Sequence, residues 1–334
     1  MQSEIIAAVV VSAAAFLVVL TLVPVLIRIM TKHNWMVKDV NRLGGAMIPR
    51  PGGPAIIAAI IVSELIFFFV FSTNDMVSRQ ISAVLITTSA AFVIGFVDDR
   101  KVMGGWFKPL ALAVSALPII LLGAYEPTLA FPIFGEVRIP LLSMVVIVVM
   151  ISIAGNTINS IDVMNGVASG FVTIASIALT ISLVIVQEYD VAIMSLPLVF
   201  ASLAFYRYHK FPSRIFPGDS GALTLGAMYG AIAIVGNVEV IAAIALLPAV
   251  INSFLFLSSV KKIVEHRQIK GPTMHTDDNK ITATKEKDAP ITLVRLLVAR
   301  RPLSEKEVGF AIFRLAAFSA SLAVVSAFLM GVRI

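Results

Sequence analysis

The sequence predicts an all-α membrane protein of about ten transmembrane helices with a large last cytoplasmic loop. Hydrophobic residues make up 58% of the 334 residues and charged residues only 14%, and the mean hydropathy is +0.96. This composition leaves too few polar side chains to cover a water-soluble globule. The apolar runs do not alternate with period two, so helices are predicted rather than the strands of a membrane barrel.

The apolar runs that predict these helices cover residues 5–29, 55–71, 81–97, 110–124, 141–153, 167–186, 191–206, 222–235, 240–260 and 308–332. The first run is too long for the core of a signal peptide and lacks a basic leader, so we expect it to be retained as the first helix. No soluble domain longer than the last loop interrupts the runs. The sequence has no cysteine, which excludes disulfides and thiol chemistry.

Lysine and arginine are concentrated in alternate loops. Residues 28–50, 100–108, 207–214 and 261–306 hold 22 of the 26 basic residues. Cytoplasmic loops of membrane proteins carry such an excess, so we expect these loops in the cytoplasm and both termini outside. The net charge of +6 therefore indicates topology, and we expect no nucleic-acid partner.

The stretch from Asn156 to Gly166 places three asparagines and an aspartate between two apolar runs. If the helix continues through it, Asn156, Asn159, Asp162 and Asn165 step by three residues and form a polar wall on one face. The alternative is a helix end with capping amides, because Asn and Asp favour such positions.

Two further acidic motifs lie at the ends of apolar runs. Asp98 and Asp99 end the third run, where carboxylates are costly unless they are paired, metal-bound or facing a wet cavity. They predict a pair that binds a cation or accepts a proton; the alternative is a charged stop at the membrane edge. Asp219 starts the eighth run, where it could cap the helix or hold magnesium against a diphosphate.

Residues 218–221 also fit the G-x-S-G motif of an intramembrane serine protease. A serine nucleophile needs a histidine base within hydrogen-bond reach. We disfavour the protease because all four histidines fall in predicted loops, namely His33, His209, His266 and His275.

With the predicted topology, the acidic motifs and the basic residues 261–306 emerge on one side of the membrane. A basic loop alone would indicate only attraction to anionic lipid. Acids that can hold a metal, facing cations that can hold phosphate, predict a phosphoryl-transfer site. The alternative from another class is a secondary transporter with a polar ion site at Asn156 to Asp162, although the chain shows no clear inverted repeat.

These motifs resemble those of the polyprenyl-phosphate N-acetylhexosamine-1-phosphate transferase superfamily, which has an Asp-Asp pair, an N-x-x-N-x-x-D stretch and a G-D-[ST] motif in this order. Here they read Asp98-Asp99, Asn156-x-x-Asn159-x-x-Asp162 and Gly218-Asp219-Ser220. The chain is most similar to the UDP-GlcNAc:dolichyl-phosphate GlcNAc-1-phosphotransferase branch. Asn165-Gly166 stands where bacterial members usually have Asp-Gly, their His-x-His-His motif is missing, and Glu265-His266-Arg267 is similar to an Arg-His-Arg sugar-recognition motif.

The resemblance implies a role for each matching residue. Asn159 and Asp219 would hold Mg²⁺, with Mn²⁺ as a substitute, and Lys108 would contact the diphosphate. Asp98 or Asp99 would position or deprotonate the acceptor. The rest of the substrate site would be Asn165 at the uracil edge, Phe216 stacked on the uracil ring, His266 and Arg267 at the sugar, and Asn156, Asp162 and Gly166. Val163 stands where most relatives have glycine, and the dolichyl branch often lacks an acid at Asp162, which leaves the role of Asp162 open.

The implied function is transfer of GlcNAc-1-phosphate, or a similar sugar-1-phosphate, from a UDP-sugar to a polyprenyl or dolichyl phosphate. This would be the first membrane step of lipid-linked glycan assembly, as in N-glycosylation. Residues 1–334 would form a single integral membrane transferase domain, with residues 261–307 as a cytoplasmic loop that completes the donor site. The partners would be the UDP-sugar donor, the polyprenyl or dolichyl phosphate acceptor and membrane lipid. A homodimer is one of the assemblies that the resemblance allows. The location would be the plasma membrane of a prokaryote or the endoplasmic reticulum of a eukaryote.

Overall fold

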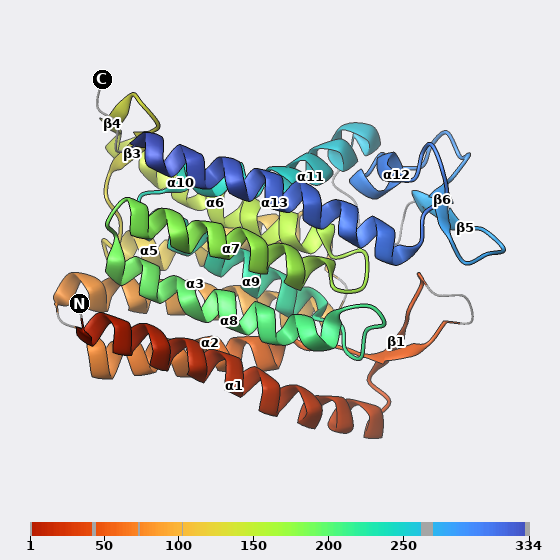
Figure 1. The fold of residues 1–334 in the computed structure, drawn as a ribbon, viewed down its shortest axis with the longest axis horizontal. Coiled ribbons are helices and arrows are strands. Elements are labelled where there is room, and N and C mark those ends of the chain that lie inside the picture. The colour runs from red at the N-terminus through yellow and green to blue at the C-terminus, as the bar shows by residue number, and fades with distance from the viewer. Residues whose placement is uncertain (1, 42–44, 73, 102, 262–269, 331–334) are drawn as a thin grey trace.

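The computed structural model describes residues 2–41, 45–72, 74–101, 103–261 and 270–330. Within these residues, 8 helical segments are long and apolar enough to span a membrane. They are α1 (Gln2–Lys32), α2 (Gly53–Ile66) with its π-helical continuation η1 (Phe67–Phe71), α3 (Asp75–Arg100), α6 (Pro140–Ile161), α7 (Val167–Ile185), α8 (Tyr189–His209), α9 (Gly218–Val235) and α13 (Glu305–Met330). They run lengthwise through the molecule (Figure 1).

The two remaining predicted spans are broken helices. α10 (Glu239–Ala245) and α11 (Leu247–Val260) meet at an angle of 71°, next to Pro248, which cannot donate a backbone hydrogen bond. α4 (Phe107–Ser115) and α5 (Leu117–Leu121) form a shorter apolar segment with Pro118 at its break. Within the described residues, each predicted apolar run therefore lies mainly on a helix, and the candidate spans number 8, or up to 9 with the bent pair, rather than ten. The prediction of an all-α polytopic membrane protein is confirmed.

Short antiparallel hairpins close the two ends of the bundle (Figure 1). The strands are β1 (Met36–Lys38) with β2 (Met47–Pro49), β3 (Thr128–Phe131) with β4 (Gly135–Arg138), and β5 (Thr273–His275) with β6 (Ile281–Ala283). The β3–β4 hairpin lies at the end where α1 begins and α13 ends. The other end carries β1, β5, β6 and the short helix α12 (Leu293–Leu297). We call it the charged end, because Asp98, Lys108 and Asp219 lie there.

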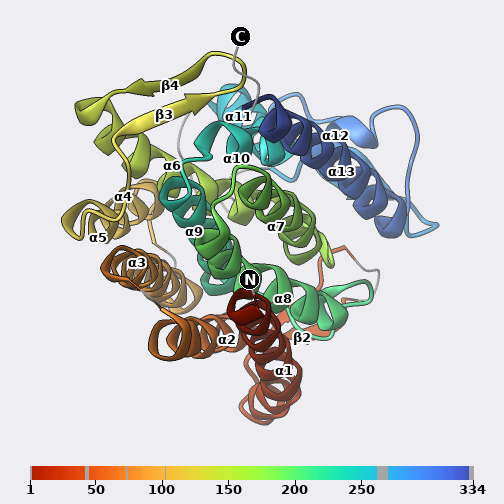
Figure 2. The same cartoon turned by 60° about the vertical axis from the view of Figure 1, so that its left-hand side comes forward.

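Helix α9 lies at the centre of the bundle (Figure 2). It contacts α2, α3, α6, α7, α8 and α10, and 94% of its residues are buried. Its many Gly and Ala residues allow α3 and α6 to approach its backbone closely. This packing places Asp219, in the first turn of α9, at the centre of the charged end.

Large apolar side chains cover the outer surface of the bundle. Phe69, Leu121 and Leu141 are among the most exposed of them. Exposed apolar surface of this extent indicates contact with the membrane, because its exposure to water would be energetically unfavourable. The fold is thus that of an integral membrane protein.

The described part of the last loop, residues 270–304, packs over the charged end. The Leu293 amide donates to Asn252 Oδ1 of α11 at 2.9 Å, and His275 Nε2 lies 3.0 Å from the Val40 carbonyl oxygen. The loop is therefore anchored both to a membrane helix and to the segment that follows β1.

Candidate active site

A cavity of about 720 Å³ lies at the charged end, a size suited to a nucleotide-sized ligand. Its walls come from the ends of α3, α6 and α8, the starts of α4 and α9, α11, and the loops around residues 37–41 and 270–275. The structure brings together in it seven of the residues that the sequence analysis selected, namely Asp98, Lys108, Asn159, Asp162, Asn165, Phe216 and Asp219.

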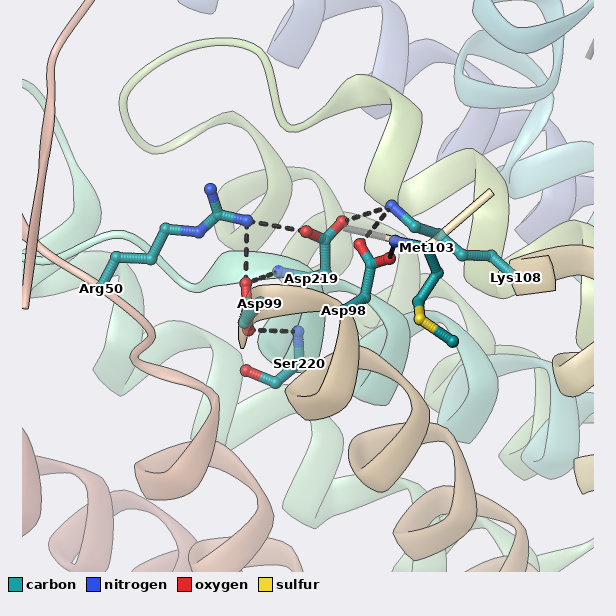
Figure 3. A network of polar contacts seen from close by, with 7 residues as sticks. All are labelled: Arg50, Asp98, Asp99, Met103, Lys108, Asp219 and Ser220. Atoms are coloured by element: carbon teal, nitrogen blue, oxygen red, sulfur yellow. Dashed lines mark hydrogen bonds and ion pairs between the residues drawn. The ribbon is translucent and has the colours of Figure 1, made fainter. Parts of the chain in front are cut away.

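Three carboxylates and two cations form a continuous chain along this cavity (Figure 3). Arg50 Nη2 lies 2.8 Å from Asp99 Oδ1 and 2.7 Å from Asp219 Oδ2. Lys108 Nζ lies 3.0 Å from Asp219 Oδ1 and 2.7 Å from Asp98 Oδ2. Because the charges alternate, each carboxylate is compensated at a depth where an isolated one would be very unfavourable.

Asp99 differs from the other two carboxylates because it accepts hydrogen bonds from the start of α9. The amides of Asp219 and Ser220 donate to its two oxygens, both at 2.9 Å. Its side chain is only 1% exposed, and it is absent from the cavity wall. Gly218 allows this contact, since a Cβ there would lie 2.7 Å from both Asp99 oxygens. Asp99 therefore caps α9 from a neighbouring helix, satisfying amides that have no intrahelical partner.

Asp98 faces the cavity and is held in place on its other side. The Met103 amide donates to Asp98 Oδ1 at 2.9 Å, which leaves Oδ2 for Lys108. Of the Asp98-Asp99 pair, only Asp98 is placed to contact a ligand in the cavity.

Arg50 was not selected by the sequence analysis. Its local sequence, Pro49-Arg50-Pro51 followed by Gly52 and Gly53, carries no pattern typical of a functional site. Burial by itself would lower the pKa of Arg50, but the nearby Asp99 and Asp219 outweigh it and raise the pKa. The guanidinium therefore stays charged in the cavity wall.

Asp162 is the C-cap of α6, which ends at Ile161. The polar stretch from Asn156 to Gly166 therefore does not continue as one helix. Burial raises the pKa of Asp162 to about 7, against the opposing effect of the Arg50 charge. Its Oδ1 lies 3.7 Å from His209 Nε2, and His209 Nδ1 lies 2.9 Å from Ser169 Oγ. The expectation of a loop at His209 was wrong, because His209 is the last residue of α8 and is buried.

Asn165 lines the cavity and lies in a buried polar network. Its Nδ2 donates to Asp39 Oδ2 at 3.2 Å and to Glu305 Oε1. Its Oδ1 accepts from the Ser213 amide at 2.9 Å. The Nδ2 donors of this amide are thus engaged within the protein, so donation to a base would require one of these bonds to be exchanged, whereas Oδ1 can accept a second hydrogen bond.

The other predicted residues lie at various distances from the cavity. Phe216 lines it, with its ring packed edge-on against His209. Asn156 lies deeper along α6, donates to the Ser152 carbonyl at 2.7 Å and does not line the cavity. Gly166 starts α7 with a left-handed φ of 83° and acts through the backbone turn. His266 and Arg267 lie outside the described residues.

The positions of these residues weigh against both alternative chemistries. Ser220 is fully buried at the start of α9, so it could not serve as a protease nucleophile. Asn159 and Asp162 lie at the end of α6 rather than in its middle, whereas an ion site of a transporter lies near the midplane.

The oxygen donors in the cavity fit a magnesium ion that also binds phosphate. Asp219 and Asn159 both line the cavity, and their side chains carry a carboxylate and an amide oxygen, respectively. Among the residues that the structure describes, no group of three or more His, Cys, Asp or Glu could hold a metal on its own. Magnesium commonly takes one or two carboxylates and completes its shell with phosphate oxygens and water.

A buried chain of carboxylates and cations at one end of a helical membrane bundle offers ligands for a divalent cation and donors for phosphate oxygens. Residues 81–237, which include Asp98, Asn159 and Asp219, match the family described as Glycosyl transferase family 4. This match and the relatives described below support a phospho-sugar transferase and are consistent with the polyprenyl-phosphate N-acetylhexosamine-1-phosphate transferase superfamily.

Relatives from archaea and bacteria match most of the chain. It is 24% identical over 302 residues, 90% of each chain, to a candidate UDP-N-acetylglucosamine–dolichyl-phosphate N-acetylglucosaminephosphotransferase of Saccharolobus solfataricus. It is 23% identical over 228 residues to a protein of the same name from Sulfolobus acidocaldarius, covering 67% of this chain and 70% of the relative. It is 28% identical over 243 residues to a phospho-N-acetylmuramoyl-pentapeptide-transferase of Caldicellulosiruptor bescii, covering 66% and 72%.

Proposed function

We propose that the protein transfers GlcNAc-1-phosphate from UDP-GlcNAc to a polyprenyl or dolichyl phosphate and releases UMP. The observation that carries the proposal is the chain of charges from Arg50 to Asp98 in a nucleotide-sized cavity. The similarity to the relative from Saccharolobus solfataricus over 90% of the chain supports this choice of substrates.

In the proposed reaction, an oxygen of the acceptor phosphate forms a bond to the β-phosphorus of the donor. The bond from that phosphorus to the bridging oxygen breaks, and its electron pair leaves on the α-phosphate of UMP. The acceptor is already mostly ionised near pH 7, because the second pKa of a phosphate monoester is about 6. Asp98 therefore serves to position the acceptor, and no general base is required.

The negative charge of the donor is met by residues on the cavity wall. Asp219 and Asn159 would hold Mg²⁺ or Mn²⁺, which neutralises charge on the diphosphate and on the leaving UMP. Arg50 and Lys108 provide further positive charge. Phe216 presents the ring on which uracil would stack, and His266 and Arg267 would bind the sugar.

The proposed setting is an integral membrane enzyme whose charged end faces the cytoplasm. The basic residues of the loops at this end support that orientation. The lipid tail of the acceptor would lie in a groove between helices that opens to the bilayer. The host membrane would be the plasma membrane or the endoplasmic reticulum, according to the organism, and a homodimer would be compatible with the reaction.

One assay tests the proposal directly. The protein, purified in detergent, is incubated with magnesium, a polyprenyl phosphate and a panel of radiolabelled UDP-sugars, and the lipids are then extracted. We expect label from UDP-GlcNAc in the lipid phase and UMP in the aqueous phase. If the lipid were labelled only from another UDP-sugar, that sugar would be the substrate in place of GlcNAc. If none of the UDP-sugars labelled the lipid, the proposed transfer would be refuted.

Asn165→Ala should weaken discrimination between nucleotide donors more than it slows turnover. By analogy with base-edge recognition in nucleic acids, a bidentate amide contact contributes about 1 to 3 kcal/mol of selectivity. The measurement is the ratio of turnover on UDP-GlcNAc to turnover on TDP-GlcNAc and GDP-linked sugars. An unchanged ratio with a lowered Tm would instead assign Asn165 only to the support of Asp39 and Glu305.

Arg267→Ala should lower kcat/KM on UDP-GlcNAc by about ten- to a hundredfold. The basis is the loss of a charged donor to the acetamido carbonyl, about 1.5 to 3 kcal/mol, with tenfold per 1.4 kcal/mol. UDP-glucose lacks the acetamido group and should scarcely respond. If Arg267 only attracts anionic headgroups, kcat/KM should fall equally on UDP-GlcNAc and UDP-glucose and should recover when anionic lipid is added. That result would show that Arg267 does not bind the sugar.

A further inference from the structure

Each carboxylate oxygen of Asp219 forms an ion pair with one basic side chain. Arg50 Nη2 lies 2.7 Å from Oδ2, and Lys108 Nζ lies 3.0 Å from Oδ1 (Figure 3). Together the two side chains place two positive charges on the carboxylate that fits a divalent cation. They therefore compete with any cation that approaches Asp219.

The two ion pairs of Arg50 differ in their access to the cavity. Its partner Asp99 is 1% exposed and is committed to the start of α9 by the amides of Asp219 and Ser220. The Asp219 side chain is 14% exposed and the Arg50 side chain is 27% exposed, and both line the cavity. A ligand in the cavity can therefore reach the Arg50–Asp219 pair but not the Arg50–Asp99 pair.

The backbone around Arg50 is tied to the segment that leads to Asp219. The Arg50 amide donates to the Trp35 carbonyl at 3.2 Å, and the Phe216 amide donates to the Pro49 carbonyl at 3.0 Å. The Gly52 amide donates to the Phe216 carbonyl at 2.8 Å. These bonds fix the Cα of Arg50, so an exchange of partners involves only its side chain.

The guanidinium has more hydrogen-bonding capacity than these two pairs use. Arginine offers five N–H donors in a planar fork that suits phosphate oxygens, and both ion pairs here are made by Nη2. A phosphate group beside Asp219 would therefore find donors on Arg50 while the pair with Asp99 persists.

We propose that Arg50 is an exchangeable counter-ion of Asp219: it releases Asp219 Oδ2 when a divalent cation and a nucleoside diphosphate arrive, stays paired with Asp99, and donates to the diphosphate. The inference rests on the proposed function, since it takes the donor to be a nucleotide sugar. Arg50 thereby couples the two ligands. In the free protein a divalent cation must displace Arg50, whereas with a diphosphate present the displaced guanidinium gains a new acceptor, and the coupling is reciprocal.

The test measures binding rather than transfer. Free Mn²⁺ is followed by electron paramagnetic resonance as it binds to the full-length protein in detergent, first alone and then with UDP. Removing the competing charge in Arg50→Gln should tighten the binding of Mn²⁺ alone by about tenfold, equivalent to about 1.4 kcal/mol. The affinity for UDP at saturating Mn²⁺ should fall by about tenfold in the same variant.

Two further variants complete the comparison. Arg50→Lys keeps the charge that compensates Asp99 but has a single donor head, so its affinities for Mn²⁺ alone and for UDP should fall between those of Arg50→Gln and the wild type. Should Arg50→Gln not be monodisperse, the shift in Arg50→Lys alone decides the question. Arg138→Gln removes the same charge from the exposed strand β4, at the opposite end of the bundle, and should change neither affinity.

Unchanged or weaker binding of Mn²⁺ alone in the Arg50 variants would overturn the exchange. Unchanged UDP affinity would overturn the phosphate contact. Neither measurement contains a sugar or a polyprenyl phosphate, so a failure of the proposed transfer, seen in the lipid-labelling assay, remains distinguishable from a failure of the role of Arg50.

Discussion

Asp219→Asn and Asp219→Ala should abolish transfer while the protein still inserts and folds. Asp219 is the cavity-wall carboxylate that would hold the cation for the donor diphosphate, and a neutral amide cannot replace its charge. Removing a single electrostatic stabiliser of a developing anion typically costs a factor of about 10² to 10³ in kcat. Because the cation would depend on Asp219, we expect a loss at least this large.

The fold should tolerate these substitutions for a specific reason. Without Asp219, Arg50 keeps Asp99 as its partner and Lys108 keeps Asp98. The start of α9 also keeps its cap, since Asp99 accepts from the backbone amides of residues 219 and 220. The measurements are initial rates at saturating magnesium and the Tm in detergent, with Asp278→Asn in the exposed last loop as the control. Wild-type turnover in either Asp219 variant would exclude Asp219 as a metal ligand.

Asp99→Ala should have the opposite profile and lower stability as well as activity. The substitution leaves two amides at the start of α9 without their acceptor and removes one of the two partners of Arg50. Breaking a buried charged pair of this kind typically costs about 3 to 5 kcal/mol. Asp99→Asn should not restore stability, because an amide offers one oxygen where both carboxylate oxygens accept.

The Tm in detergent separates this structural role from a direct catalytic one. We expect a clear fall in Tm for both Asp99 variants, compared with little change for Asp278→Ala. If the Asp99 variants melted like the wild type but were inactive, Asp99 would have to contact the substrate directly, against its position beneath α9.

The sequence determined the membrane fold and the selection of candidate residues. Hydropathy is a sum of local transfer free energies, so runs such as 81–97 and 191–206 predict helices without any knowledge of their neighbours. The order of the motifs was likewise enough to select Asp98, Asn159 and Asp219, which the structure gathers at one cavity.

The tertiary structure decided which member of each motif faces the cavity. Asp98 and Asp99 are adjacent in sequence, yet one lines the cavity and the other caps α9. Asn165 belongs to the selected stretch, but its amide is held by Asp39, Ser213 and Glu305.

The place of Arg50 in the candidate site was determined by the tertiary structure alone. It stands 49 residues from Asp99 and 169 residues from Asp219, and no local pattern marks it as part of the site. An ion pair depends on the distance between two charges, and that distance is set here by the packing of α3 and the β2–α2 segment against the start of α9. Transfer free energies add along the chain and can be read from it, whereas Coulomb interactions depend on positions in space that only the folded bundle supplies.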